Sequence, residues 1–302
     1  MHLTFGPIPS RRFGMSLGID LSANTKQCNF DCLYCELAPA KTVGKQTYSS
    51  SVQDIVLQVK DSLIKHPNVD VITFTANGEP TLYPYLDELI DEIDKIKAEA
   101  KTLILSNGAN IYDLNIQKTL SKIDIVKLSL DCISQKCFKK LDRVDSSVDC
   151  SKILQGILDF KASFSPTLVI EILFVQNMNN KTDEITKLVD ALNQIQPNRL
   201  DIGTIDRPPA YDVQPLSFEE LERIANQFSN QNVTIAYKER PKSHETYGKD
   251  EILTLLKRRP LTHEDIENTF DKNSKNILKN LVDTKQISTI NKSGVEFYKF
   301  VE

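Results

Sequence analysis

The chain has 302 residues, of which 40% are hydrophobic and 26% are charged, and its net charge is −4 at pH 7. This length exceeds the ~100–200 residues of a typical domain, so it allows one large α/β domain or a large domain with a small one appended. The composition is that of a globular protein and excludes disorder, collagen and coiled coil. The net negative charge argues against a broad nucleic-acid-binding surface but not against a local basic patch.

Strand and helix patterns alternate along the first 240 residues. Apolar strands separated by helices predict a parallel sheet covered by helices, with catalytic groups in the loops that follow the strands. The expected strands are 16–19, 69–75, 102–105, 125–130, 167–175, 199–205 and, shorter, 233–237. The expected helices are 52–65, 85–98, 117–121, 134–142, 148–162, 183–195 and 218–228.

Residues 241–302 are expected to form a separate small domain after a first domain of residues 1–240. Three helices and a strand pair are typical of a winged helix, which binds nucleic acid in some proteins and docks proteins in others. Basic and acidic residues nearly balance in this tail, so we keep RNA contact as an alternative only. The expected helices are 251–258, 263–270 and 274–284, and the expected strands are 287–290 and 295–301.

Glycine and histidine are scarce, and their spacing excludes common motifs. No two of the 10 glycines have the spacing of a G-x-G-x-x-G turn or a G-x-x-x-x-G-K phosphate loop, and the 4 histidines are too far apart for H-E-x-x-H. The N-terminus lacks the apolar segment of a signal peptide, and no stretch approaches the ~20 apolar residues of a membrane span. We therefore expect a cytoplasmic protein without a membrane partner, whose closely spaced cysteines bind metal rather than form bridges.

Three of the 6 cysteines, Cys28, Cys32 and Cys35, have the spacing C-x3-C-x2-C. Structural zinc sites generally take four ligands, and no fourth cysteine or histidine is near, although a zinc knuckle remains an alternative. A 4Fe-4S cluster held by three cysteines leaves one iron open to another ligand. The other cysteines, Cys132, Cys137 and Cys150, are expected to be isolated structural residues, with ligation of an auxiliary cluster as the alternative.

With this loop the chain resembles the radical S-adenosylmethionine superfamily. That motif has an aromatic residue before its last cysteine, which is Tyr34 here. Over residues 12–240, the resemblance implies a partial (β/α)6 barrel whose three cysteines bind a 4Fe-4S cluster. It also implies that S-adenosylmethionine binds the open iron and is cleaved reductively to a 5′-deoxyadenosyl radical, which abstracts hydrogen from a substrate.

A second match follows the second expected strand. The run Asn77-Gly78-Glu79-Pro80 is similar to the family's G-G-E-P motif, with asparagine in place of the first glycine. The resemblance implies contact of Asn77, Gly78 and Glu79 with the methionine amino group. It also implies that Tyr34 lies near the adenine, and that three residues at the ends of later strands contact the ribose or carboxylate, namely Asn107, Ser129 and Asp131.

Residues 6–20 and 201–209 resemble the branch of the superfamily that includes wyosine-type tRNA-modifying enzymes. Those enzymes carry a second cluster on cysteines upstream of the motif, and no cysteine precedes Cys28 here, so their tRNA chemistry does not transfer directly. Arg11, Arg12 and Arg207 are expected either to meet an anionic substrate or to pair with carboxylates. Lys127 is a further candidate substrate ligand if it faces the barrel interior.

Two functions are weighed. The first is a radical S-adenosylmethionine oxidoreductase with one 4Fe-4S cluster. Its electron donor is expected to be a reductase or a flavodoxin- or ferredoxin-type protein. Its substrate is unidentified, with an RNA nucleotide as one candidate. The second is a non-catalytic iron-sulfur or zinc sensor that regulates through its winged helix. Polar residues gathered beside the cluster after the second to fourth strands favour the enzyme, because a sensor does not need them.

Overall fold

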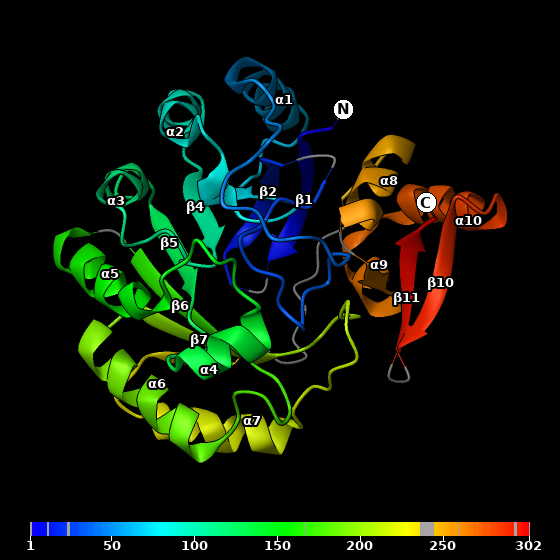
Figure 1. Ribbon diagram of the computed structural model, residues 1–302. Coiled ribbons are helices and arrows are strands. Elements are labelled where there is room, and N and C mark those ends of the chain that lie inside the picture. The colour runs from blue at the N-terminus through cyan, green and yellow to red at the C-terminus, as the bar shows by residue number, and fades with distance from the viewer. Residues whose placement is uncertain are drawn as a thin grey trace.

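The computed structural model describes residues 2–10, 12–22, 25–165, 167–235, 245–258, 260–292 and 295–301. Eight strands form one sheet in which neighbours in sequence are neighbours in space, β1 to β8. All pairs from β2 to β8 are parallel. The long helices form an arc outside the curved sheet (Figure 1). The predicted α/β fold with a partial barrel is therefore confirmed.

The element bounds agree closely with the expected ranges. The strands are β1 (Thr4–Ser10), β2 (Gly14–Asp20), β3 (Val71–Thr75), β4 (Lys101–Ser106), β5 (Ile125–Ser129), β6 (Thr167–Phe174), β7 (Arg199–Thr204) and β8 (Val233–Ile235). The outer helices are α1 (Val52–Lys65), α2 (Leu86–Asp94), α3 (Leu114–Leu120), α5 (Cys150–Ser163), α6 (Thr182–Ile195) and α7 (Phe218–Ala225). The short helical segments are η1 (Pro80–Leu82), α4 (Gln135–Cys137), η2 (Phe138–Asp142) and η3 (Asn226–Phe228).

Side chains of the parallel strands alternate between two environments. Val126 and Leu128 of β5 are fully buried and belong to the hydrophobic core that the outer helices cover. Because successive side chains of a strand point to opposite faces, the intervening Lys127 faces the barrel interior. Lys127 thus has the inward orientation that its candidate role as a substrate ligand requires.

One strand was not expected from the sequence. β1 pairs antiparallel with β2 at the edge of the sheet, with an irregular register between Phe5 and Ile8. Pro7 and Pro9 lie in this strand and break the alternation by which strands are recognised in a sequence. An edge strand tolerates proline because one side of it has no ladder to which an N–H must donate.

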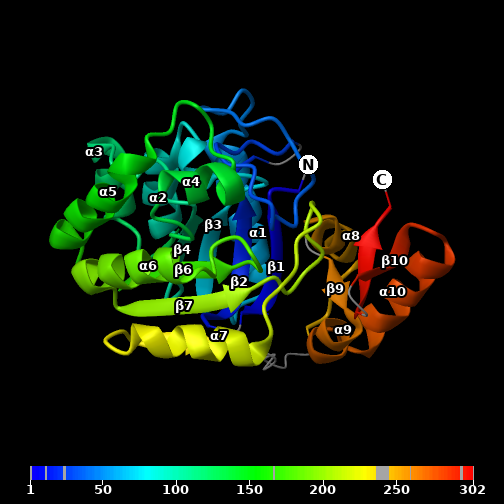
Figure 2. The ribbon, with the colours of Figure 1, turned by 60° about the horizontal axis from the view of Figure 1, so that its bottom comes forward.

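The C-terminal residues form a second, smaller unit beside β1 (Figure 2). Its three strands pair antiparallel in the order β10-β11-β9. The expected helices and strand pair are present; the winged-helix assignment stays a prediction, and the proposed boundary at 240/241 lies outside the described residues. The elements are α8 (Lys249–Arg258), β9 (Leu261–Thr262), α9 (His263–Thr269), α10 (Lys272–Asp283), β10 (Ile287–Lys292) and β11 (Val295–Phe300).

β1 connects the two units. Phe5 and Ile8 pack against the apolar core of the C-terminal unit. The buried Tyr247 donates a hydrogen bond from its hydroxyl to the carbonyl oxygen of Pro7 at 2.5 Å. The strand that the sequence analysis missed therefore holds the C-terminal unit against the barrel. No helix among the described residues is long and apolar enough to cross a membrane.

Candidate metal and cofactor site

The three cysteines of the C-x3-C-x2-C motif lie in the long loop between β2 and α1. Cys28, Cys32 and Cys35 are free thiols and are partly buried. The backbone N–H of Cys35 donates to the carbonyl oxygen of Cys32 at 3.1 Å, which closes a tight turn around the last two cysteines. Three free thiols on one such loop fit three irons of a 4Fe-4S cluster.

Burial affects all three thiols. It raises the pKa of Cys28 to about 12 and the pKa of Cys32 well above its usual value, and it also raises the pKa of Cys35. Thiolates rather than thiols bind metal, so iron must displace protons when it binds here.

The loop after β3 holds the start of the cysteine loop. Gln27 N donates to the carbonyl oxygen of Asn77 at 2.9 Å, and Glu79 N donates to the carbonyl oxygen of Gln27 at 3.0 Å. Between them Gly78 has φ +142°, and a Cβ there would lie 1.9 Å from the Gln27 oxygen. Asp20, at the end of β2, accepts a hydrogen bond from Asn77 N at 2.8 Å. Glycine is therefore required at position 78 for the two loops to meet.

The Glu79 side chain is 1% exposed and points into the protein. Its Oε1 accepts hydrogen bonds from Thr81 N at 3.0 Å and from Ser106 Oγ at 2.7 Å, and its Oε2 accepts one from Asn107 N at 2.8 Å. Burial raises the pKa of Glu79, and these hydrogen bonds oppose the rise. The carboxylate therefore braces the loops after β3 and β4, a role that the sequence analysis did not foresee. Its contact with a methionine amino group stays a prediction.

Asn107 brings the loop after β4 to the first cysteine. Its Nδ2 donates to Asn29 Oδ1 at 2.7 Å and lies 3.7 Å from Cys28 Sγ. Groups that hydrogen-bond to metal ligands orient those ligands and tune the metal. The structure thus brings Asn107 into the site beside Cys28, and its contact with the ribose or carboxylate stays a prediction.

Tyr34 and Asp131 are joined directly. The Tyr34 hydroxyl donates to Asp131 Oδ2, and Leu173 N donates to Asp131 Oδ1 at 2.7 Å. Burial raises the pKa of Asp131 to about 7, against the effect of both hydrogen bonds. Ser129, two residues earlier, is opposite Glu171 in the strand register and lies toward the barrel interior. The ends of β5 and β6 thus meet the cysteine loop through Tyr34.

Sequence reasoning missed two charged residues of this site. Lys26 Nζ lies 3.3 Å from Asp31 Oδ1; burial lowers the pKa of Lys26, but the neighbouring Cys35 and Asp31 outweigh burial and raise it. Asp142 of η2 is buried beside Cys32, and burial raises the pKa of its carboxyl well above the usual value. Lys26 could have been noted as the cation two positions before the motif, whereas nothing in the sequence connects Asp142 to Cys32.

Two of the candidate arginines pair with carboxylates. Arg207 contacts both oxygens of Glu36 at 3.1 and 2.9 Å, and Arg12 contacts Glu171 Oε1 at 3.0 Å. Arg11 lies outside the described residues. Of the two alternatives left open for these arginines, pairing with carboxylates is thus observed for Arg12 and Arg207.

The expectation that the remaining cysteines are isolated is wrong for two of them. Cys132 and Cys137 form a disulfide, and Cys150 is free. The short α4 turns the chain back after β5, so the two Cα atoms come within 5.5 Å, a distance that a disulfide spans. Two of the three thiols considered for an auxiliary cluster are therefore bonded to each other.

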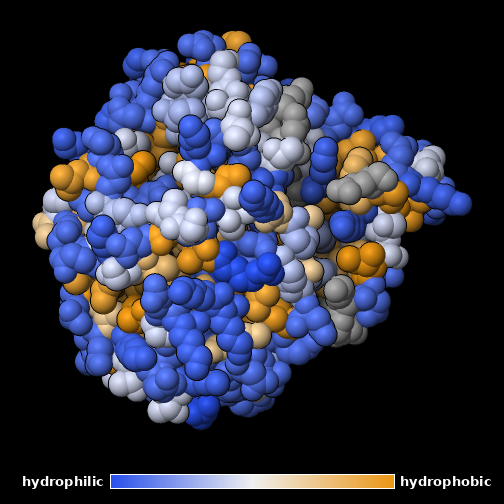
Figure 3. All heavy atoms as spheres, in the orientation of Figure 1, coloured by the Kyte–Doolittle hydropathy of each residue, from blue (hydrophilic) through white to orange (hydrophobic). Residues whose placement is uncertain are grey.

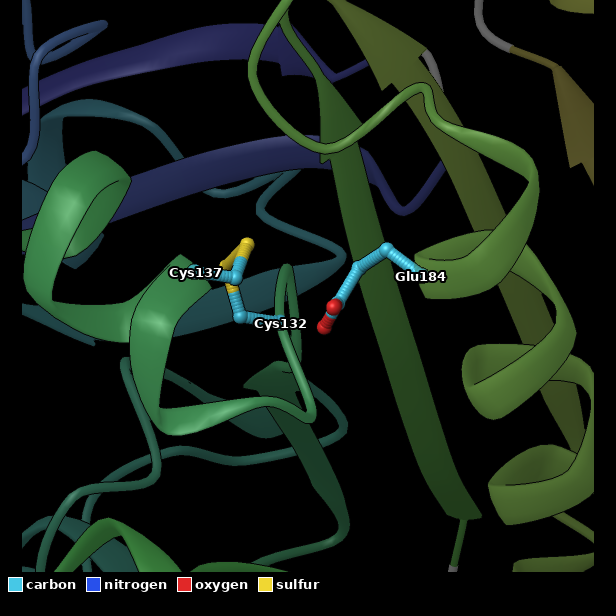
Figure 4. A group of neighbouring side chains, drawn as sticks. All are labelled: Cys132, Cys137 and Glu184. Carbon is cyan, nitrogen blue, oxygen red and sulfur yellow. A yellow bond between two sulfur atoms is a disulfide. The ribbon is translucent and has the colours of Figure 1, made fainter.

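A carboxylate oxygen of Glu184, from α6, lies within 4.8 Å of both sulfur atoms (Figure 4). Its Oε1 accepts hydrogen bonds from Ile133 N at 2.6 Å and Ser134 N at 2.8 Å, and its Oε2 accepts one from Ser134 Oγ at 2.6 Å. Glu184 therefore fixes the loop between the two cysteines, and its oxygens are already engaged.

Reducing this disulfide is expected to lower the free energy of unfolding by about 2 kcal/mol, because the bridge closes a short loop and constrains the unfolded chain. Chemical denaturation of the metal-free protein with and without dithiothreitol measures the difference. The double variant Cys132→Ser/Cys137→Ser should be insensitive to dithiothreitol. An equal response in that variant would contradict the assignment of the effect to this bridge.

A partial α/β barrel with three free thiols after its first parallel strand, and with polar loops of the next strands around them, defines a class of enzyme that binds an iron-sulfur cluster with an open iron. A sequence profile described as "Radical SAM superfamily" matches residues 25–189. The chain belongs to this superfamily, in which SAM stands for S-adenosylmethionine.

Known proteins agree with the assignment. A "UPF0026 protein" of Helicobacter pylori is 39% identical, covering 99% of this chain and 97% of that protein. A "Probable GTP 3′,8-cyclase" of Saccharolobus islandicus is 27% identical over 63% of this chain, which spans only 57% of that relative. The crystal structure of a radical SAM methyltransferase from Sphaerobacter thermophilus shares the fold, with TM-score 0.56 and 12% identity over 74% of this chain and 66% of that one.

Members of the superfamily use a 4Fe-4S cluster and S-adenosylmethionine, and the residues described here fit the cluster. The three thiols are free and share one loop, and an amide nitrogen and an ammonium group lie beside them. The positions of Tyr34, Asn77, Gly78, Ser129 and the other candidate cofactor residues relative to S-adenosylmethionine stay predictions, as does the likeness to the wyosine branch.

Proposed function

We propose that this radical SAM enzyme holds its cluster on Cys28, Cys32 and Cys35 and acts on a substrate bound in the barrel interior. The observation that carries the proposal is the set of three free thiols on one loop, which hydrogen bonds join to the loops after β3, β4 and β5. When bound, the reduced cluster supplies the electron that cleaves S-adenosylmethionine to a 5′-deoxyadenosyl radical able to abstract hydrogen.

The protein's own groups orient the thiols and shield them from water. Asn107 Nδ2 and the Lys26 ammonium lie beside the sulfur atoms and stabilise negative charge there. The loop after β7 covers the cysteine loop, because Ala210 N donates to the carbonyl oxygen of Cys35 at 2.7 Å and the Tyr211 hydroxyl donates to Asp31 at 2.6 Å. Water exclusion of this kind protects a reactive intermediate.

The barrel interior offers charged groups to a substrate. Lys127 Nζ lies 2.6 Å from Glu171 Oε1 and 3.3 Å from Asp201 Oδ2. The Asp201 side chain is 0% exposed, whereas that of Glu171 is 29% exposed. Above them, a Cβ on Gly203 would meet no atom within 4 Å, so this side of β7 borders open space. Partial burial raises the pKa of Glu171, but Lys127 and Arg12 outweigh it and lower the pKa. The ionised carboxylate of Glu171 is thus available to a hydrogen-bond donor.

A polar substrate suits these groups. The similarity to a probable GTP 3′,8-cyclase supports a nucleotide as substrate, and an RNA nucleotide is one candidate. An electron donor is required by enzymes of this superfamily, and we infer that a reductase or a flavodoxin- or ferredoxin-type protein fills that role. The sensor alternative is disfavoured by the network of Glu79, Asn107 and Asp131 around the cysteine loop.

The proposal predicts that the anaerobically reconstituted protein, reduced with dithionite and given S-adenosylmethionine, forms 5′-deoxyadenosine. Chromatography measures the product, and electron paramagnetic resonance of the reduced cluster should change when S-adenosylmethionine is added. Protein carried through the same procedure without iron and sulfide is the control. Absence of product together with a resonance that ignores S-adenosylmethionine would sink the proposal.

A further inference from the structure

Three exposed lysines form a local basic patch on α4 and η2. Lys136, Lys139 and Lys140, together with Gln135, line a shallow depression of the surface. Within the described part of the chain, no acidic side chain forms a salt bridge with any of the three. The surface over α4 is strongly hydrophilic (Figure 3). In a chain of net charge −4, this patch therefore carries an uncompensated positive charge.

The buried side of the same segment contacts the cysteine loop. Asp31 N donates to the carbonyl oxygen of Asp142 at 3.0 Å, and Leu33 N donates to that of Leu141 at 2.9 Å. The rings of Phe30 and Phe138 meet edge to face with centroids 6.5 Å apart. Figures 1 and 2 place α4 on the side of the barrel that carries the loop after β2. The lysines thus lie across one helical turn from the cysteines.

The helical turn that separates the lysines from the cysteine loop is thin enough for electron transfer between proteins. A helix with its side chains is ~10 Å across, so a redox group held against the lysines would lie roughly one helix diameter from the cysteine loop. The backbone hydrogen bonds between η2 and residues 31–33 fix the patch relative to the cysteines. A partner that binds the lysines is therefore placed against the segment that contacts the cysteine loop.

We propose that Lys136, Lys139 and Lys140 form the docking site of an acidic electron-donor protein that carries a flavin or an iron-sulfur cluster. The inference rests on the proposed function, because an electron-donor protein is needed only if the cluster must be reduced before S-adenosylmethionine is cleaved. Opposite charges steer such an encounter and orient the partner. One electron leaves the donor's reduced group, which is oxidised, and reduces the cluster; no bond forms between the proteins. RNA fits less well, because three isolated lysines neutralise few phosphates.

The test uses the full-length reconstituted protein and compares two reductants, flavodoxin with its reductase and NADPH, and dithionite. Reversing the patch with Lys136→Glu/Lys139→Glu/Lys140→Glu should lower flavodoxin-driven formation of 5′-deoxyadenosine at least about tenfold, because attraction becomes repulsion. The dithionite-driven rate should stay within about twofold of the parent, because a small reductant needs no docking site. Added salt should slow the flavodoxin-driven rate of the parent only.

A matched control reverses three exposed lysines on outer helices, Lys60→Glu/Lys118→Glu/Lys187→Glu, which changes the net charge equally. This control should retain the flavodoxin-driven rate. The variant Lys136→Gln/Lys139→Gln/Lys140→Gln should show a smaller loss, because it removes the positive charges without adding carboxylates.

The outcomes separate the two proposals. An unchanged flavodoxin-driven rate in the patch variant would overturn the docking site, and so would an equal loss of rate in the control variant. If the patch variant loses tRNA binding but keeps flavodoxin-driven turnover, the patch is an RNA site instead. If dithionite yields no product even in the parent, the proposed function fails. In that case, titration of flavodoxin into the parent and into the patch variant tests the docking site by itself, because binding is measured without turnover.

Discussion

Replacing Cys32 with alanine is expected to leave the purified protein without a stable iron-sulfur cluster and to abolish cleavage of S-adenosylmethionine. Among the described residues of the loop after β2, these three are the free cysteines. Two of them cannot supply the three ligands of the site. Burial holds Cys32 in the thiol form, and iron binding has to convert it to a thiolate, a step that alanine cannot make. Iron and sulfide analysis after anaerobic reconstitution, with the visible absorption spectrum, measures the loss.

Cys150→Ala is the matched control. Cys150 is also a free, partly buried cysteine, but it lies at the start of α5. Its variant should bind the full complement of iron and sulfide and should form 5′-deoxyadenosine at the parent rate. Retention of a full cluster by the Cys32 variant, or its loss from the Cys150 variant, would refute the ligand assignment.

Gly78→Ala is expected to separate the loop after β3 from the cysteine loop. A Cβ at this position would lie 1.9 Å from the carbonyl oxygen of Gln27, and the φ of +142° is strained for any side chain. Both effects break the hydrogen bonds that Gln27 makes with Asn77 and Glu79. We expect a loss of about 2 kcal/mol or more in the free energy of unfolding. We also expect cluster content and binding of S-adenosylmethionine to fall at least about tenfold, as measured by iron analysis and calorimetry.

Gly203→Ala provides the comparison for that result. Gly203 lies in the carboxyl half of β7, near the same end of the barrel, but a Cβ there meets no atom within 4 Å. This variant should keep its stability and its cluster. If both glycine variants behave alike, the close approach of the loops at Gly78 is not what positions the cysteines.

The sequence predicted the parallel sheet and the cluster loop well because both depend on local patterns. Strands such as Val71–Thr75 are short apolar runs between helices with regular apolar spacing, and that alternation specifies the topology. The β1 strand escaped this reasoning because Pro7 and Pro9 interrupt its pattern, and its partners, β2 and the C-terminal unit, are recognised only in space.

The contacts within the site were less predictable than its location. Glu79, Asn107 and Asp131 were expected beside the cluster because parallel strands bring their carboxyl ends to one edge. That Glu79 bonds Asn107 N, and that Tyr34 bonds Asp131, depends on the side-chain directions after folding. The disulfide was missed because a spacing of five residues does not by itself show that a turn brings Cys132 and Cys137 together.

The sequence by itself indicated the class of chemistry, because three cysteines spaced C-x3-C-x2-C lie close together in the chain and, with Asn77-Gly78-Glu79-Pro80, resemble the motifs of the radical S-adenosylmethionine superfamily. It also predicted the order of the parallel strands and the helices between them, through residue periodicity. Only the tertiary structure decided which strand face carries Lys127 and which residues brace the thiols. It alone brought the segment with the basic patch, α4 and η2, against the cysteine loop, because packing rather than local pattern sets the distance between residues far apart in sequence.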